Sequence, residues 1–415
     1  MEPLLDRHLL GTAARLLDAF PALVVQGARQ VGKSTFVGML TSGRPANVVT
    51  LDDPQSLDAA RADPVGFVSQ ARVATLVIDE IQRAPELILP IKAAIDRDRT
   101  PGRFVLTGSA DLLRIERTPD SLAGRAVSID LFGLSQGERL GRHDDFVARV
   151  LGLGAGDAER TTLRRSDYAA MVGRGGYPEL RDRDWADSRV WLDSYLTRIV
   201  QRDANDLRRN VDPARLRSVL RLLAANQAGE LVKARVAQQA ALPATTIPAY
   251  LDLVEAMYLV RLLPSWTPNL TRREIARPKA VICDSALALR LARLTPEQLV
   301  PVVGGEHFGA MLEGFVVGEL MRQQGWSTQP HELFHYRDRD GLEVDVVIEL
   351  DDGRVIGVEV KAAEAARSEH FTPLRALAQR LGERFAAGIV LCTAESGQRF
   401  GERMRSLPVA SLWEL

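Results

Sequence analysis

The sequence has little of what would tie it to a particular environment. Only two of its 415 residues are cysteine, and Cys283 and Cys392 have neither metal-ligand spacing nor the repeat of a disulfide framework. No apolar run reaches the ~18 residues of a membrane span. The first ten residues, MEPLLDRHLL, contain acids and lack the apolar core of a secretory signal. We therefore expect a protein of the reducing cytoplasm that does not cross a membrane.

The chain also lacks an excess of charge. Its 53 Lys and Arg residues stand against 54 Asp and Glu residues, which gives a net charge of −1. An overall attraction to nucleic acid or to a membrane is excluded, so any electrostatic footprint has to be local. The apolar fraction of 46% is ordinary for a globular protein, and the length suggests about two to three domains.

A phosphate-binding loop is predicted between residues 22 and 35, ALVVQGARQVGKST. A short β-prone run leads into the pattern G-x-x-x-x-G-K-S and a helix pattern follows, which is the context that this motif requires. Glycine lets the backbone come close to a ligand, successive N–H groups point at phosphate oxygens, and the helix N-terminus adds partial positive charge. The expected nucleotide contacts are Gly27, Ala28, Arg29, Gln30, Val31, Gly32, Lys33, Ser34 and Thr35.

Two side chains of this loop have a chemistry of their own. Lys33 is expected to reach the β- and γ-phosphates, and Ser34 to offer its hydroxyl to Mg²⁺. The alternative is an ordinary glycine turn. The joint presence of the strand, the spacing, the lysine and the serine disfavours that alternative.

Strands and helices alternate over the first 130 residues. Predicted strands are Ala22–Val25, Asn47–Leu51, Thr75–Ile78, Phe104–Leu106 and Ala126–Leu131. Helical patterns lie between them, for example at residues 85–97. This alternation predicts an α/β fold with a parallel sheet and helices on both faces. Ligands of such sheets bind at the carboxyl ends of the strands.

Polar residues follow directly after two of these strands. Asp79 is expected to hold Mg²⁺, and Glu80 to orient or deprotonate the attacking water. A solvated acidic strand end is the alternative. Ser109, after the next strand, is expected to contact the γ-phosphate or that water, and an N-cap for a helix starting at Ala110 is an equally good and compatible interpretation.

Arg125 comes just before the fifth predicted strand, in the run LAGR. An arginine there is a candidate for stabilising the charge of the transition state, either in its own subunit or in a neighbouring one of a homo-oligomer. A solvent-exposed structural arginine is at least as good an interpretation. Arg29, inside the loop, is a weaker candidate of the same kind.

Six motifs together carry a family resemblance. GARQVGKST, LDDP, LVIDEIQRAPEL, FVLTGSADLL, LAGR and GGYPE occur in this order. The chain resembles bacterial and archaeal AAA-type ATPases whose C-terminal part is an uncharacterised domain. The resemblance implies that the nucleotide is ATP, whereas no residue of the sequence indicates base selectivity. It implies a mechanism more than a cellular role.

A winged-helix domain is predicted in the middle of the chain. Three short helical patterns, at 216–225, 232–241 and 245–255, precede two β-prone runs at 258–263 and 279–283. Such a domain holds DNA by neutralising phosphates. The candidates for this role are Lys233, Arg235, Arg272, Arg273 and Arg277, and Thr245 is expected to contact DNA from the start of the recognition helix. The third helix lacks side chains that read base edges, so the contact is expected to be mostly independent of sequence. Protein contact is the alternative role.

The C-terminal part predicts a β-hairpin after a helix at 311–322. Its strands are residues 342–350 and 354–361, joined by Asp351-Asp352-Gly353. A two-residue loop would pair Asp345 with Val360, and a three-residue loop would pair it with Glu359. Only the second register puts Asp345, Glu359 and Lys361 on one face.

Such a face has the chemistry of phosphodiester cleavage. Two nearby carboxylates favour a divalent hard cation, and Lys361 is placed to activate water. The pattern Asp345…Glu359-x-Lys361, with Glu313 upstream, resembles the PD-(D/E)xK nuclease superfamily, and this resemblance implies that Glu313 is a further metal ligand. The resemblance of the whole chain implies the same fold for this part. A structural ion-pair cluster is the alternative.

We therefore predict four segments: a P-loop ATPase core at 1–140, a helical extension at 141–210, a winged-helix domain at 211–295 and a nuclease-like α/β domain at 296–415. The leading hypothesis is an ATPase that binds and processes DNA in repair or recombination. Two others remain open. One is a nucleotide-operated switch that acts on a protein partner, and the other is a motor that remodels DNA junctions without cutting.

Overall fold

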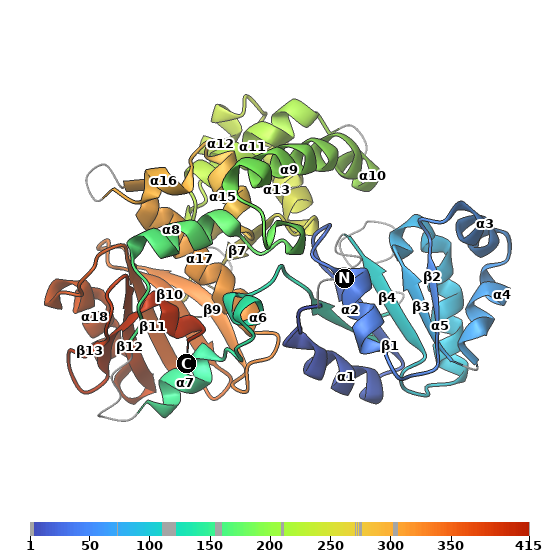
Figure 1. Ribbon diagram of the computed structural model, residues 1–415, viewed down its shortest axis with the longest axis horizontal. Coiled ribbons are helices and arrows are strands. Elements are labelled where there is room, and N and C mark those ends of the chain that lie inside the picture. Colours follow the sequence, from blue (N-terminus) through green and yellow to red (C-terminus); the bar gives the residue numbers. More distant parts are fainter. Residues whose placement is uncertain are drawn as a thin grey trace. The chain divides into compact units, whose positions relative to one another are not determined.

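A computed structural model of the chain describes residues 4–72, 74–109, 122–153, 160–208, 211–269, 271, 273, 276–301 and 306–414. They form two compact units (Figure 1). The first consists of Met1–Leu134 with Ala256–Tyr258, and the second of Ser135–Glu255 with Leu259–Leu415. The predicted winged-helix and nuclease-like segments thus belong to one compact unit. No helix in the described part of the chain is long and apolar enough to span a membrane.

The N-terminal unit is built on a parallel five-stranded sheet, in the order β2-β3-β4-β1-β5. The strands are β1 (Ala22–Gln26), β2 (Ala46–Thr50), β3 (Thr75–Asp79), β4 (Phe104–Gly108) and β5 (Ala126–Asp130). All five lie where the sequence predicts them, to within two residues at each end. Of the three inner strands, β4 and β1 are buried along their whole length, as expected for a sheet covered on both faces.

Helices cover both faces of this sheet. The helices are α1 (Leu9–Ala19), α2 (Lys33–Leu40), α3 (Pro54–Ala62), α4 (Pro64–Val68) and α5 (Ile88–Arg97). One core joins Val24, Ile78 and Leu106 of the sheet to apolar residues of α3, α4 and α5. Since side chains alternate along a strand, Leu23 and Val25 point to the other face, where α1 and α2 contact β1. The α/β fold predicted from the sequence is confirmed for this unit.

The second unit begins with helices that pack on its own core. They are α6 (Gln136–Leu140), α7 (Phe146–Gly152), α8 (Arg165–Arg174), α9 (Trp185–Arg198), a π-helical turn (Ile199–Asp203) and α10 (Ala204–Leu207). The tight turn after α8 places Tyr177 in a buried aromatic cluster with Trp191 and Tyr195 of α9. Its packing within the second unit gives this turn a structural role.

Three helices and a small antiparallel sheet follow. The helices are α11 (Pro213–Ala225), α12 (Lys233–Gln239) and α13 (Ile247–Ala256), and the strands are β6 (Gly229–Glu230), β7 (Val260–Leu263) and β8 (Lys279–Ile282). The strand order is β6-β8-β7. Helices α15 (Ser285–Leu291) and α16 (Pro296–Leu299) connect this part to the long helix α17 (Glu306–Gln323).

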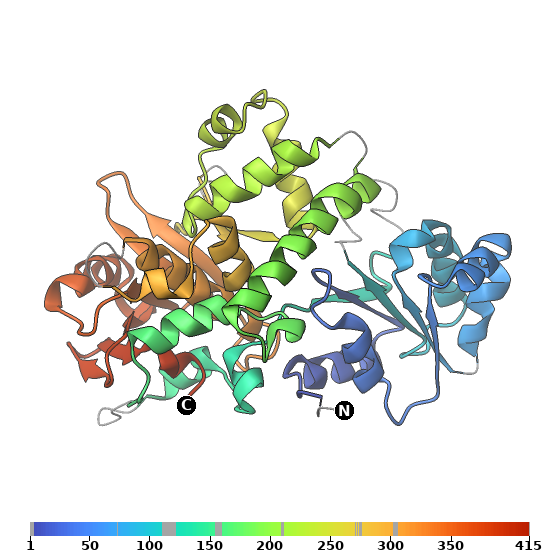
Figure 2. The same cartoon turned by 45° about the horizontal axis from the view of Figure 1, so that its top comes forward.

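A six-stranded mixed sheet forms the end of the chain, drawn in orange to red in Figure 2. Its order is β13-β14-β12-β11-β10-β9. The strands are β9 (His331–Arg337), β10 (Glu343–Leu350), β11 (Val355–Lys361), β12 (Phe385–Cys392), β13 (Gln398–Arg399) and β14 (Met404–Pro408). Helix α18 (Thr372–Leu381) buries Leu374 and Leu377 in a core with Val347 and Phe385 of this sheet.

The hairpin of β10 and β11 has the register of the three-residue loop. Val346 pairs with Val358 and Glu349 with Val355, so that the same register sets Asp345 opposite Glu359. Leu350 N–H donates to the Arg354 carbonyl at 2.9 Å, and Gly353 has a φ of +81°, the left-handed conformation that favours glycine. Of the two predicted registers, the one with the three-residue loop is confirmed.

Candidate functional sites

The phosphate-binding loop lies between β1 and α2, at the carboxyl end of a central strand. Gly32 caps α2 with a φ of 92°, and Gln30 also has a positive φ of 65°. The Lys33 side chain is buried, and its Nζ donates to the carbonyl of Gly27 at 3.0 Å and to that of Ala28 at 2.9 Å. Burial lowers the pKa of Lys33 to about 8, although Glu80 and Asp79 act in the opposite direction.

Gly27 has a steric role that the sequence did not indicate. A Cβ atom at this position would lie 2.1 Å from the Leu131 carbonyl oxygen, which follows β5. The loop therefore needs glycine here in order to pack against the neighbouring strand. Close approach to a ligand is not the only reason for it.

A hydroxyl and a carboxylate meet beside the loop. Ser34 Oγ donates to Asp79 Oδ2 at 2.9 Å, and the Thr107 hydroxyl at the end of β4 donates to Asp79 Oδ1. An oxygen pair of this kind suits Mg²⁺. Ser34 and Asp79, chosen from the sequence as metal ligands, are thus brought together by α2 and β3.

Glu80 follows Asp79 with a φ of 58°, which is uncommon for a residue other than glycine and concentrates at functional sites. Its N–H donates to Thr107 Oγ1 at 3.2 Å. Its carboxylate accepts a hydrogen bond from the Gln82 amide, and the same amide donates to Ser109 Oγ at 2.9 Å. Gln82 thus links the two predicted residues Glu80 and Ser109. The proposed cap of a helix at Ala110 lies outside the described residues.

The sequence missed Gln82 and Thr107. Thr107 stands two residues before Ser109 in the polar end of the same strand, and that position was the available signal. Gln82 stands two residues after the acidic pair in the run DEIQ, and a long amide there was the available signal. Both side chains are placed by short local segments at the same edge of the sheet as the loop.

Arg125 lies at the opposite edge. The parallel register pairs Ala22 with Ala126, so Arg125 stands where the strands begin, roughly 13 Å of strand away from the loop. Its guanidinium makes two bonds to the Asp96 carboxylate, of 2.7 and 3.1 Å. The predicted action on the nucleotide of its own subunit is therefore wrong. Arg29, by contrast, lies in the loop itself.

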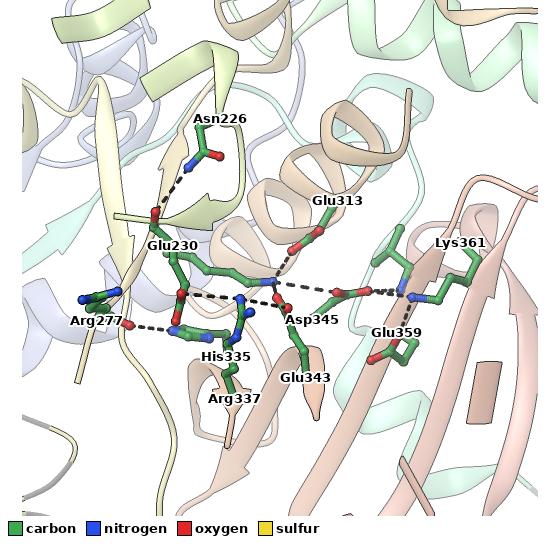
Figure 3. A network of polar contacts seen from close by, with 12 residues as sticks. Asn226, Glu230, Arg277, Glu313, His335, Arg337, Glu343, Asp345, Glu359 and Lys361 are labelled. Carbon is green, nitrogen blue, oxygen red and sulfur yellow. Dashed lines mark hydrogen bonds and ion pairs between the residues drawn. The ribbon is translucent and has the colours of Figure 1, made fainter. Parts of the chain in front are cut away.

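A second constellation of charges lies in the C-terminal sheet (Figure 3). Asp345 Oδ2 accepts the Val360 N–H at 2.8 Å and lies 3.5 Å from Lys361 Nζ. Lys361 also pairs with the Glu359 carboxylate, whose Oε1 is buried without a partner. Burial and repulsion from Asp345 raise the pKa of Glu359 to about 7. The hairpin thus brings Asp345, Glu359 and Lys361 together.

A lysine that the sequence did not single out lies between Glu313 and Asp345. Lys279 Nζ of β8 lies 2.7 Å from Glu313 Oε1, 2.8 Å from Glu343 Oε1 and 3.8 Å from Asp345 Oδ1. Burial would lower the pKa of Lys279, but these carboxylates raise it. In the described part of the chain no group of three or more His, Cys, Asp or Glu side chains is arranged to hold a metal ion. The predicted set of Glu313, Asp345 and Glu359 is therefore not assembled.

The candidate DNA-binding residues divide into two groups. Lys233, Arg235, Thr245 and Arg277 are exposed, while Arg272 lies outside the described residues. Arg273 is already bound within the protein. Its guanidinium makes two hydrogen bonds to the Glu349 carboxylate, of 2.6 and 3.0 Å, and lies over the rings of Trp266 and Phe334. Its assignment to DNA is wrong, because this partly buried guanidinium already has a carboxylate partner.

The predicted winged-helix domain is also connected to the C-terminal sheet, through the segment that follows its β-prone run 258–263. Trp266 N–H donates to the His335 carbonyl at 2.6 Å, and His335 N–H donates to the Pro264 carbonyl at 2.9 Å. The segment after β7 thus pairs with β9, the last strand of that sheet. This pairing covers an edge that would otherwise expose unpaired backbone groups.

Comparison with known proteins agrees with the geometry of the first site. Residues 19–140 match an AAA domain. Residues 165–298 and 308–412 match two domains of unknown function, DUF8612 and DUF4143. Together with the loop, Lys33 and the pair Asp79-Glu80, the first match defines the N-terminal unit as an AAA-type ATPase domain.

The relatives identify the family. The uncharacterized proteins Rv2008c of Mycobacterium tuberculosis and Mb2031c of Mycobacterium bovis are each 30% identical to this chain over 349 residues, which is 84% of this chain and 71% of theirs. The chain belongs to the family of these two proteins.

Solved structures give weaker matches. AMPPCP-bound DnaA from Aquifex aeolicus has a TM-score of 0.30 and 10% identity, over 60% of this chain and 86% of that one. A DNA replication initiation factor has a TM-score of 0.28 and 12% identity, over 57% of this chain and 69% of that one. TM-scores this low support no conclusion about the fold or the function of this chain.

Proposed function

We propose that this protein hydrolyses ATP with Mg²⁺ in order to act on DNA. The observation that carries the ATPase part is the meeting of Ser34, Asp79 and Glu80 beside the phosphate loop. Ser34 and Asp79 would hold Mg²⁺, which neutralises phosphate charge when it is bound with ATP. Glu80 takes the proton of the attacking water as general base.

Lys33 has to exchange its hydrogen-bond partners when ATP binds. In the structure its ammonium bonds to two carbonyls of its own loop. Phosphate oxygens have to replace these carbonyls as its partners when ATP binds. Because a phosphate is charged and a carbonyl is not, the exchange favours the bound state through charge-assisted hydrogen bonds.

The DNA part of the proposal is supported by the second unit. Its order of helices and strands from α11 to β8 suits a winged-helix domain, with Lys233, Arg235 and Thr245 exposed around α12 and the start of α13. Lys233, Arg235 and Arg277 are suited to phosphate contacts, which hold DNA largely independently of its sequence. A switch that acts on a protein partner is the competing function.

The deciding experiment measures ATP hydrolysis with and without single-stranded, duplex and branched DNA. We expect stimulation by at least one DNA form, loss of turnover in Lys33→Ala, and normal turnover in a control, Lys92→Ala. Hydrolysis that no DNA form changes would favour the protein switch. Normal hydrolysis by Lys33→Ala would remove the ATPase proposal itself.

A second candidate function is metal-dependent cleavage of DNA by a nuclease-like domain. The observation that favours it is the buried, unpartnered Oε1 of Glu359 beside Asp345. This pair of carboxylates would hold the ion, which activates water when it is bound, and Lys361 would orient that water. We expect Mg²⁺-dependent nicking that Glu359→Ala and Asp345→Ala abolish and Lys33→Ala retains. Intact nicking by Asp345→Ala would refute this site.

Arg125 is proposed to act only on the nucleotide of a neighbouring subunit in a homo-oligomer. To act on the nucleotide of another copy, Arg125 has to exchange its two bonds to Asp96 for bonds to phosphate. Mixing Arg125→Ala with Lys33→Ala protein tests this role. Each variant alone should be inactive, and mixed oligomers should regain part of the activity, because the Lys33→Ala copy supplies the arginine and the Arg125→Ala copy the intact loop.

A further inference from the structure

Lys279 is the most deeply buried charge of the second constellation. It is 1% exposed, although it begins strand β8 in the small three-stranded sheet. Its side chain enters a group of carboxylates from α17 and β10, which belong to a different part of the second unit. A buried ammonium of this kind has to be paired in order to be tolerated.

The position of its nitrogen excludes a metal ion from the same place. Nζ lies 2.7 Å from Glu313 Oε1 and 3.8 Å from Asp345 Oδ1, so it stands between the two acids. A divalent ion shared by these oxygens would need about 2.0–2.6 Å to each. That position overlaps the ammonium, and the two positive charges repel each other.

The other side of Asp345 is different. Its Oδ2 faces the Val360 N–H and Lys361, next to Glu359, and Lys361 is a partly exposed side chain. Asp345 therefore divides the constellation. One half, with Glu313 and Glu343, has a buried resident cation. The other half, with Glu359, has the partly exposed ammonium of Lys361 and keeps an unpartnered oxygen.

We propose that Lys279 is a built-in cation that takes the place of a metal ion between Glu313 and Asp345. Glu313 is then no metal ligand in this chain, and a divalent ion is confined to the half formed by Asp345 and Glu359. Removing the charge of Lys279 opens a second cation site that depends on Glu313. The inference rests on the proposed metal site of the nuclease-like domain.

The test counts bound Mn²⁺ by electron paramagnetic resonance in full-length protein. Lys279→Ala removes both the charge and the side-chain atoms that fill the position. We expect this variant to bind one ion more than the wild type, and the double variant Lys279→Ala/Glu313→Gln to lose that ion. A folded Lys279→Ala protein with an unchanged ion count would overturn the proposal.

A second variant covers the case in which Lys279→Ala does not fold. Glu313→Gln in the wild-type background should leave the number and affinity of bound Mn²⁺ unchanged within about twofold, because Lys279 already excludes Glu313 from the ligands. A loss of tenfold or more, equal to about 1.4 kcal/mol, would show that Glu313 binds the metal and would overturn the proposal. Arg337→Gln is the control. Arg337 is an exposed residue that forms an ion pair with Glu343, and its variant should bind Mn²⁺ as the wild type does.

The metal readout separates this inference from the proposed cleavage. If every variant binds Mn²⁺ as expected but none cuts DNA, the nuclease function fails and the role of Lys279 stands. If the wild type cuts DNA and Glu313→Gln loses both metal and cleavage, the nuclease function stands and the role of Lys279 fails.

Discussion

Lys33 combines a binding role with a cost in stability. Its pKa is lowered to about 8 by burial, against about 10.4 in an unfolded chain. Between these pH values the unfolded state binds more protons, so stability rises as the pH increases from about 8 to about 10.5. Below pH 8 the buried charge destabilises the N-terminal unit.

Lys33→Met should therefore stabilise the nucleotide-free protein at pH 7, by roughly 2–3 kcal/mol, and by much less at pH 10. Urea unfolding followed by far-ultraviolet circular dichroism measures this difference. All five tryptophans lie in the second unit, so their fluorescence identifies its transition separately. The exposed Lys233→Met is the control and should follow the wild type at both pH values. Equal stability of Lys33→Met and wild type at pH 7 would contradict the argument.

Gln82 should act on Glu80 without binding ATP. Its amide bonds to both Glu80 and Ser109, and a hydrogen bond to a charged group contributes about 1.5 kcal/mol. Gln82→Leu should lower kcat about tenfold and leave KM within about twofold. Steady-state kinetics measures both constants. Gln70→Leu, which removes an exposed amide bonded to Asn47, is the control. A raised KM with unchanged kcat would mean that Gln82 serves binding instead.

The hairpin of β10 and β11 shows how a turn fixes a site one strand length away. Gly353 ends the three-residue loop in the left-handed region, and the register that follows sets Asp345 opposite Glu359. A one-residue slip would send one of them to the other face of the sheet. The loop is thus part of the site, although it contributes no ligand.

Gly353→Val should destabilise the second unit by about 1–2 kcal/mol, since a β-branched residue is strained at a φ of +81°. Tryptophan fluorescence in urea measures the change. Gly309→Ala in α17 is the matched control: a Cβ there meets nothing within 4 Å, so alanine should stabilise the helix by up to about 1 kcal/mol. If Gly353→Val were as stable as the wild type, the loop would not be restrained in this conformation.

Local patterns explain which elements could be predicted from the sequence. The phosphate loop, the acidic strand end and the hairpin register each depend on residues close together in the chain, and the structure places them as expected. Arg273 was misjudged and Lys279 was overlooked because their partners are distant in the chain. Arg273 meets Glu349 only because the segment after β7 pairs with β9. The run Lys279–Ile282 indicated a strand, and nothing nearby indicated the three carboxylates around its first residue.

The second unit contains both parts that are proposed to act on DNA, the part around the small sheet and the C-terminal part. Lys279 and Arg273 both come from the part around the small sheet, and both are paired with acids of the C-terminal part. Breaking a buried pair by removing one partner typically costs about 3–5 kcal/mol. The small sheet and the C-terminal sheet are therefore expected to unfold together, and the basic side chains left for DNA are the exposed ones.

The triple variant Lys233→Ala, Arg235→Ala and Arg277→Ala should weaken DNA binding by the full-length protein at low salt. Each lost phosphate contact reduces the slope of log K against log salt by about 0.9, so the reduction counts how many of the three residues touch DNA. Titration of labelled duplex DNA at several salt concentrations measures the slope, and DNA-stimulated ATP hydrolysis should fall with the affinity. The matched control removes three other exposed basic side chains, those of Arg142, Arg164 and Arg367. If the control lowers the slope as much as the triple variant, the net charge of the unit holds the DNA, and the surface around α12 has no special role.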